Sequence, residues 1–304
     1  MNVMPQPLSS MGHPLDLADT AFGLPTPSEP LLGQPDKLRA RLEADGYLYI
    51  RGFFPSPTIM RARRSLTDRL AAEHLLHPDH PAIEAVAAPG VDSHFRPDLA
   101  KDNPHVDEVV HGSKLLEFYA SLLGGPVRHY DYTWLRAVGP GHGTKPHCDL
   151  VYMGRGTHEL LTCWIPYGDV PLELGGLIVL EQSHLKSDVL GSYLSRDVDS
   201  YCVNRPAEAA LAQEGKSSWS GHLSNNPHSL QKKLGGRWLT AEWRAGDFIT
   251  FKMNLVHGSL DNHTDRIRLS SDTRYQLASE PADERWIGPA PSGHGRAGKR
   301  GRIC

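Results

Sequence analysis

The chain has 304 residues, a length that suggests about two domains but that one β-rich domain can also reach. Its formal net charge of −3, with 22% charged residues, gives no electrostatic reason to expect nucleic acid or an anionic membrane as the main partner. We find no apolar run long enough to span a bilayer and no signal-peptide layout at the N-terminus.

The cysteines give a further indication of the environment. They show neither a CxxC spacing nor the pattern of a disulfide framework, so their usage fits a reducing, cytoplasmic location. The four are Cys148, Cys163, Cys202 and Cys304.

The first part of the chain reads as scaffold. Residues 1–33 contain Pro, Ser and Leu without period, and we expect them to be loosely ordered or draped over the domain. Leucine spacing predicts a helix over 36–45 that ends at Gly46, followed by a strand over 47–52. A second, amphipathic helix is predicted from Ser56 to Ala71.

The next part alternates between irregular and regular segments. Residues 75–111 are rich in Pro, His and Asp, and we expect surface loops there rather than a loop that roofs a pocket. A helix over 114–123 is closed by two glycines. Residues 186–236 carry few strand signals, and such long segments in compact enzymes tend to be lids or binding loops. Strands are predicted over 127–138, 160–167, 175–184, 237–243, 248–257 and 266–270.

The residues that point to chemistry are His147 and Asp149. They lie two apart in a segment, 145–153, that we predict as an extended strand, so an imidazole and a carboxylate project the same way. Taken alone the pair is weak, because most such histidines are ordinary surface or core residues. The natural third ligand is His257, at the end of the apolar strand that follows the Gly246-Asp247 turn. Two histidines and one carboxylate form the facial triad of non-haem Fe(II) oxygenases.

The order of these features resembles the phytanoyl-CoA dioxygenase family of Fe(II)/2-oxoglutarate-dependent oxygenases, over about residues 36–276. The resemblance rests on the His-x-Asp segment, the Gly-Gly strand at 175–180, the strand ending in His257-Gly258-Ser259 and the arginine strand at 266–270. Similar to the family, too, is the start of the chain, with a helix, the sequence DGYLYIRGFF and then a long helix. One departure is Glu181-Gln182, where relatives usually carry Pro-Gly in a turn away from the metal.

The resemblance implies a mainly β (α+β) fold, a double-stranded β-helix of the jelly-roll or cupin-like type with flanking N-terminal helices. It implies one oxygenase domain over 34–288, in which 186–236 is a lid-like insertion that shapes substrate choice. The Gly-rich basic end, 289–304, is expected to be a flexible tail.

The implied reaction uses Fe(II), 2-oxoglutarate and O2. It hydroxylates, or otherwise oxidises, a small molecule while 2-oxoglutarate is decarboxylated to succinate and CO2. His147, Asp149 and His257 would be the metal ligands and the catalytic residues. The presence of Asp149 argues for hydroxylation, desaturation or ring formation, because related halogenases lack the carboxylate.

The resemblance also assigns cosubstrate residues. Arg268 matches the arginine that holds the distal carboxylate, a role suited to a planar guanidinium. Ser259 would be its hydroxyl partner, and Arg266 on the same strand face remains a second candidate. Trp164 falls where relatives have a tryptophan near the cosubstrate, although a core tryptophan explains it nearly as well.

Two other functions stay open at this point. One is a jelly-roll metal-binding protein or isomerase without oxygenase activity, which would not need Arg268. The other is an oxygenase acting on protein or nucleic acid, for which a basic groove with aromatic platforms would be expected and is not seen. The sequence does not name the substrate, and a natural-product or lipid-like metabolite is the class that we predict.

Overall fold

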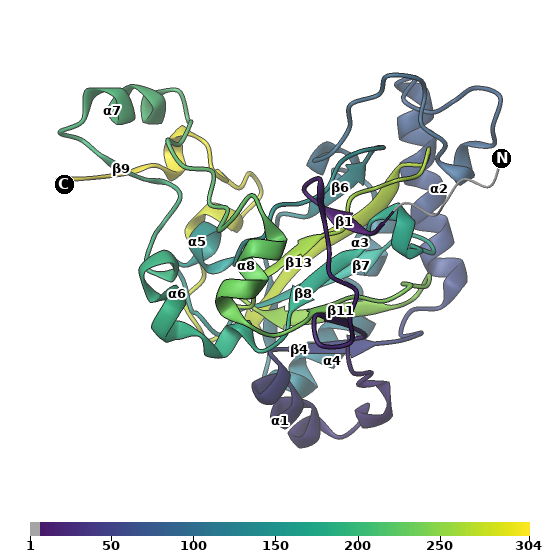
Figure 1. Ribbon diagram of the computed structural model, residues 1–304, viewed down its shortest axis with the longest axis horizontal. Helices are drawn as coiled ribbons and strands as arrows, with labels where there is room; N and C mark the ends of the chain where they lie inside the picture. The colour runs from purple at the N-terminus through teal and green to yellow at the C-terminus, as the bar shows by residue number, and fades with distance from the viewer. Residues whose placement is uncertain (1–6) are drawn as a thin grey trace.

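A computed structural model describes residues 7–304 of the protein (Figure 1). Its largest sheet has six strands, all paired antiparallel. The long strand β13 pairs with three of the others, β5, β6 and β7. The order is β4 (Tyr47–Ile50), β11 (Phe248–Lys252), β7 (Leu161–Pro166), β13 (Arg268–Leu277) and β5 (Val127–His129), and β6 (Trp134–Val138) also pairs with β13.

A second sheet has four strands, in which β8 and β10 are central. Its order is β12 (His257–Ser259), β8 (Leu177–Leu180), β10 (Trp238–Leu239) and β3 (Phe22–Gly23). Apolar side chains of β4, β7 and β11 pack against those of β8 and β10, so one hydrophobic core lies between the two sheets. Two small sheets complete the strands, β1 (Ser9–Ser10) with β2 (His13–Pro14) and β9 (Ser200–Cys202) with β14 (Arg300–Arg302).

Helices cover the outer faces of both sheets. The outer face of the six-stranded sheet packs on α1 (Pro35–Asp45), α2 (Ser56–Ala72), α3 (Pro104–Val110) and α4 (Ser113–Leu123). The outer face of the four-stranded sheet packs on α6 (Ser187–Leu194) and α8 (Pro227–Leu234). Two further helices are α5 (Leu150–Met153) and α7 (Pro206–Gln213). Within the described residues, no helix is long and apolar enough to cross a membrane.

The predicted scaffold is confirmed in the early part of the chain. Helix α1 ends where Gly46 adopts a left-handed conformation, with φ of 79°, which a glycine adopts without a steric penalty. Helices α2 and α4 and strand β4 also lie where the sequence predicts them. Of the segment 1–33, residues 1–6 lie outside the described residues, and the rest is draped over the domain, since β3 pairs with β10.

Several strand and loop predictions were wrong in detail: the strands expected over 175–184 and 237–243 are shorter, as β8 and β10, and the one expected over 266–270 extends to Leu277 as β13. The segment 145–153 is not one strand, because Asp149 has helical backbone angles and leads into α5. The strand expected over 127–138 divides into β5 and β6, and the one expected over 248–257 passes from the six-stranded sheet to the four-stranded one between β11 and β12. The loop region 75–111 contains helix α3, capped by the Asn103 side chain.

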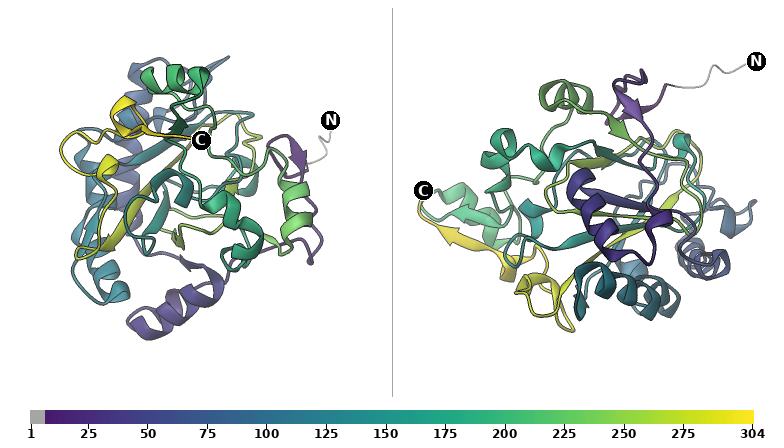
Figure 2. Two further views of the ribbon diagram at one scale, coloured as in Figure 1. Left: turned by 90° about the vertical axis from the view of Figure 1, so that its left-hand side faces the viewer. Right: turned by 90° about the horizontal axis from the view of Figure 1, so that it is seen from below.

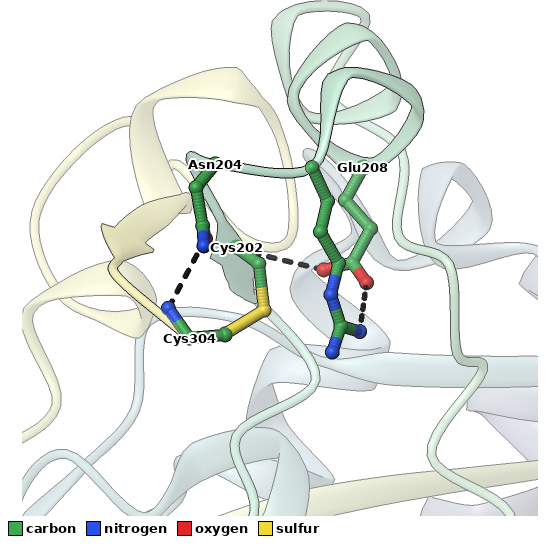
Figure 3. The surroundings of a disulfide bond; sticks show 5 residues. Cys202, Asn204, Glu208 and Cys304 are labelled. Atoms are coloured by element: carbon green, nitrogen blue, oxygen red, sulfur yellow. Dashed lines mark hydrogen bonds and ion pairs between the residues drawn. A yellow bond between two sulfur atoms is a disulfide. The ribbon is translucent and has the colours of Figure 1, made fainter.

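The expectations for the cysteines and the C-terminal tail also need correction. Cys202 and Cys304 form a disulfide between residues 102 positions apart, and β14 pairs with β9 beside it (Figure 3). Such a distant pairing leaves no spacing pattern in the sequence, which explains why it was missed. The tail end at 300–302 is thus a strand, and the cytoplasmic location stays a prediction that has lost the cysteine argument.

The disulfide joins two segments that project together from the body of the protein. In Figure 1, α7, β9 and the C-terminus lie on the side opposite α2, and both views in Figure 2 keep α7 beside the C-terminal segment. An ion cluster next to β9 links them further. Asp199 there accepts hydrogen bonds from Arg285 and, at 2.7 Å, from Lys299.

Candidate metal centre and adjoining pocket

The two histidines predicted to bind metal stand directly opposite each other. His147 and His257 form an antiparallel bridge in which each backbone N–H donates to the other's carbonyl oxygen, both at 2.9 Å. Directly opposed residues place their side chains on one face, and the two imidazole ring centres are 4.2 Å apart. The pairing of β12 with β8 fixes the His257 side of this bridge.

Asp149 completes the cluster. Its Oδ1 lies 3.6 Å from Nε2 of His147 and 3.7 Å from Nε2 of His257, and the three ligand atoms all lie within 4.8 Å of one another. A metal ion with bonds of about 2.1 Å can bridge atoms up to about 4 Å apart. Since all three residues are buried and on one side, the donor set fits a metal ion with open coordination positions.

The protonation of the histidines also suits a metal. Nδ1 of His147 lies 2.8 Å from the Lys145 carbonyl oxygen, and Nδ1 of His257 lies 3.0 Å from that of Leu255. A carbonyl oxygen can only accept, so each Nδ1 carries the hydrogen and each Nε2 keeps its lone pair for the metal. Burial, with His147 nearby, lowers the pKa of His257 to about 4, which keeps that imidazole neutral at pH 7.

The second oxygen of Asp149 is held by two residues that the sequence analysis missed. Oδ2 accepts a hydrogen bond from the Thr162 hydroxyl at 2.5 Å and from Nη2 of Arg274 at 2.9 Å. Burial alone would raise the pKa of Asp149, but Arg274 and then His257 outweigh it and hold that pKa well below its usual range. The carboxylate is therefore charged, with Oδ1 left facing the histidines.

A signal for Arg274 does exist in the sequence. Residues at every second position of β13 share a face, and Arg268 and Arg274 are six positions apart on that strand. The sequence prediction ended this strand at Ser270. Had it continued to residue 274, the alternation would have placed Arg274 on the face of Arg268.

Arg268 lies where the prediction placed it, on β13 and fully buried with 1% exposure. Its Nε and Nη2 have no hydrogen-bond partner within the described part of the chain, and it lines a small cavity together with His147 and His257. Burial lowers its pKa to about 9, helped by Arg136 and opposed by Asp272, so it stays charged at pH 7. A buried cation without partners is costly, which indicates an anion as its ligand.

The other predicted cosubstrate residues have mixed outcomes. Ser259 and Trp164 both line the cavity of Arg268. Ser259 does not bond to Arg268: its hydroxyl donates to the Leu260 carbonyl oxygen at 2.9 Å and accepts from the Thr144 N–H at 2.8 Å. Trp164 also packs edge-on against Trp243, so it serves the core as well. The second candidate, Arg266, does not reach the cavity, since its side chain is 52% exposed.

A larger pocket of about 370 Å³ opens beside the triad, within the range of small-molecule sites. Its walls come from distant parts of the chain, including the insertion at 186–236 and the C-terminal segment. The lining residues are Phe95, Trp134, Arg136, Thr144, Lys145, His147, Asp149, Tyr152, Met153, Ser220, His222, Arg274 and His294.

A family model and a known protein both match most of the chain. The family model described as "Phytanoyl-CoA dioxygenase (PhyH)" matches residues 42–270. A relative in Streptomyces exfoliatus, 1-deoxypentalenic acid 11-beta-hydroxylase, is 25% identical over 262 residues, which cover 82% of this chain and 84% of that protein.

Solved structures share the fold. The α-ketoglutarate-dependent carbocyclase SnoK from nogalamycin biosynthesis matches with a TM-score of 0.59 at 18% identity, covering 89% of this chain and 92% of its own. EctD from S. alaskensis matches with a TM-score of 0.55 at 18% identity, over 98% and 99% of the two chains. The epimerase SnoN, in complex with Fe3+, α-ketoglutarate and nogalamycin RO, matches with a TM-score of 0.53 at 21% identity, over 82% and 86%. The α+β fold described above is thus that of these enzymes.

Proposed function

The chain belongs to the phytanoyl-CoA dioxygenase family of non-haem Fe(II)- and 2-oxoglutarate-dependent oxygenases, and from this we infer that it hydroxylates a small organic molecule in the pocket beside His147 and Asp149. The observation that carries the inference is Arg268. A metal site alone does not need a buried guanidinium with free donors next to it, whereas a site that also binds a dicarboxylate does. When bound, Fe(II) and 2-oxoglutarate would supply the chemistry by which O2 oxidises the substrate, with succinate and CO2 formed from 2-oxoglutarate.

We assign the following roles to the residues. His147, Asp149 and His257 would hold the iron, and Thr162 and Arg274 occupy Oδ2 of Asp149, which leaves Oδ1 for the metal. Arg268 binds the distal carboxylate of 2-oxoglutarate.

Two more residues line the proposed cosubstrate cavity. The type of reaction is indicated by Asp149. Ser259 and Trp164 form walls of that cavity. Related halogenases lack this carboxylate so that a halide can bind, and the presence of Asp149 therefore favours hydroxylation or a related oxidation of a C–H bond.

The substrate class follows from the pocket and the relatives. A volume of about 370 Å³ suits a small molecule, and the hydroxylase from Streptomyces exfoliatus is named for acting on 1-deoxypentalenic acid. We propose a natural-product or lipid-like metabolite, with neither nucleic acid nor membrane as partner, in the cytoplasm.

We further propose that the two sheets are the walls of a double-stranded β-helix, in a single oxygenase domain over 34–288. Residues 186–236 would act as its lid. Two observations support this assignment: a hydrophobic core fills the space between the sheets, and Ser220 and His222 of the insertion line the pocket.

The test is an anaerobic titration of the Fe(II)-loaded protein with 2-oxoglutarate, followed by the visible metal-to-ligand charge-transfer band. The wild type should develop the band, and Arg268→Ala should need far more 2-oxoglutarate to do so. Arg266→Ala is the matched control, because that arginine is exposed and should leave the titration unchanged. If iron-loaded, folded wild-type protein gives no band, the chain is a metal-binding protein or isomerase rather than an oxygenase.

A further inference from the structure

The charges that line the pocket beside the triad are not balanced. Three permanently or normally cationic side chains face it, Arg136, Lys145 and Arg274, against the single carboxylate of Asp149. Arg274 and Asp149 neutralise each other through their hydrogen bond of 2.9 Å. Arg136, whose Nε is paired with Asp272 outside this lining, and Lys145 therefore remain as the cations that a ligand would meet in the pocket.

Arg136 is positioned to bind an anion. It lies on β6 two residues from Trp134, so both side chains project from the same face into the pocket. Its Nε donates to Oδ2 of Asp272 at 3.0 Å, which fixes the guanidinium. Neither Nη group makes a hydrogen bond to any described residue, and the side chain is only 17% exposed. Two parallel N–H donors in a sheltered site match a carboxylate better than they match water.

Lys145 stands at the mouth of the same pocket. It comes two residues before His147, is exposed, and has no ion-pair partner among residues 7–304. Neighbouring groups respond to this positive field. Burial and then Arg136 lower the pKa of His94 to about 4, and burial and then Lys145 lower the pKa of His222.

The cofactors leave this excess unchanged. The iron adds positive charge, and 2-oxoglutarate carries two carboxylates, of which Arg268 takes one and the metal the other. The charges of iron and cosubstrate thus cancel each other. Arg136 keeps its ion pair with Asp272 through Nε, while its two Nη groups and the ammonium group of Lys145 are still without an anion.

We propose that the substrate is a small organic carboxylate, whose carboxylate group is bound by the Nη donors of Arg136, with Lys145 drawing it into the pocket. The proposal rests on the proposed function, since it assigns the pocket to the substrate of that reaction. The competing ligand for the Nη donors of Arg136 is a carboxylate of 2-oxoglutarate itself, because Arg136 also lines the cavity of Arg268.

The experiment compares two probes of nearly equal shape, 2-naphthoate and its neutral amide 2-naphthamide. Each is titrated by calorimetry into anaerobic protein saturated with Fe(II) and 2-oxoglutarate, and the charge-transfer band is recorded throughout. A charge-assisted hydrogen-bonded pair should make 2-naphthoate bind about tenfold more tightly than the amide. Arg136→Gln should abolish the preference, and Lys145→Gln should reduce it about twofold, as for an exposed charge. Arg266→Gln changes an exposed arginine that does not line the pocket and should leave the preference intact.

The two proposals fail in different ways. Loss of the charge-transfer band in the wild type refutes the oxygenase function, whatever the probes do. With the band present, equal binding of the two probes, or no binding of 2-naphthoate at millimolar concentration, overturns the carboxylate proposal. If Arg136→Gln weakens 2-oxoglutarate and leaves the probe preference unchanged, Arg136 serves the cosubstrate and the proposal is wrong. A retained band in Arg136→Gln also shows that the variant is folded.

Discussion

Arg274 is the residue whose replacement tests the construction of the metal centre most directly. Arg274→Met removes a side chain that is 3% exposed, hydrogen-bonded to Asp149 and stacked 4.1 Å from the Trp134 ring centre. Asp149 then keeps Thr162 as a donor but has lost its cationic partner. Removing one partner of a buried ion pair costs about 3–5 kcal/mol. At about 2–4 °C per kcal/mol for a chain of this size, the apoprotein should melt about 6–20 °C lower.

A bound metal should repair part of this loss. In the variant a divalent ion becomes the main positive partner of Asp149, and the repulsion between the ion and the guanidinium is gone. The rise in melting temperature on adding Ni(II), which replaces Fe(II) without redox chemistry, should therefore be larger in Arg274→Met than in the wild type. Differential scanning fluorimetry of apo and Ni(II)-loaded protein measures both quantities.

Two controls separate the ion pair from general packing. Thr162→Val removes only a hydroxyl donor from Asp149 and should cost about 1 kcal/mol. Arg266→Met removes an exposed arginine and should change nothing. The reasoning is refuted if apo Arg274→Met is as stable as the wild type to within about 1 kcal/mol, or if Ni(II) stabilises it no more than the wild type.

Three further outcomes follow from the structure. Cys304→Ser opens the disulfide that joins residues 102 positions apart and should lower the free energy of unfolding by about 4 kcal/mol in urea titrations; an unchanged midpoint would contradict this. Gly258→Ala places a Cβ 2.8 Å from the Thr144 carbonyl oxygen, so the two segments that hold the histidines must shift and Ni(II) affinity should fall about tenfold or more in calorimetry. Burial lowers the pKa of His94 and of His111 to about 4, below the unfolded value, so their neutral forms favour the folded state. The free energy of unfolding should therefore be full above about pH 6.5 and decline as the pH falls toward 4. The double variant His94→Gln with His111→Gln should flatten that decline.

The metal triad could be read from the sequence because each ligand sits in a local pattern. His147 and Asp149 are two residues apart, and His257 ends an apolar run beside a glycine. These patterns survived two errors in the elements that carry them. Asp149 begins a helix rather than continuing a strand, and His257 lies in a different sheet from the strand before it. The prediction held because ligands are identified by chemistry and order, which do not depend on the exact end of a strand.

The supporting residues could not be predicted, for a physical reason. Thr162 and Arg274 meet Asp149 only because β7 and β13 pair in a register that aligns Thr162 with Arg274. Register depends on packing across the whole sheet, and no local pattern records it. The disulfide is similar, since nothing near Cys202 indicates a partner at Cys304.

Residues assigned to iron and 2-oxoglutarate come from both sheets, whereas residues that can select the substrate come from other segments of the chain. His257 comes from the four-stranded sheet and Arg268 from the six-stranded one, so the metal site and the cosubstrate site that we propose form only when the two sheets pack together. The outer wall of the pocket instead comes from the insertion, through His222, and from the C-terminal segment, through His294. The latter is held by Asp199, 2.8 Å from its Nδ1. Changes in these two segments should therefore alter which substrate is accepted while leaving iron and 2-oxoglutarate binding intact.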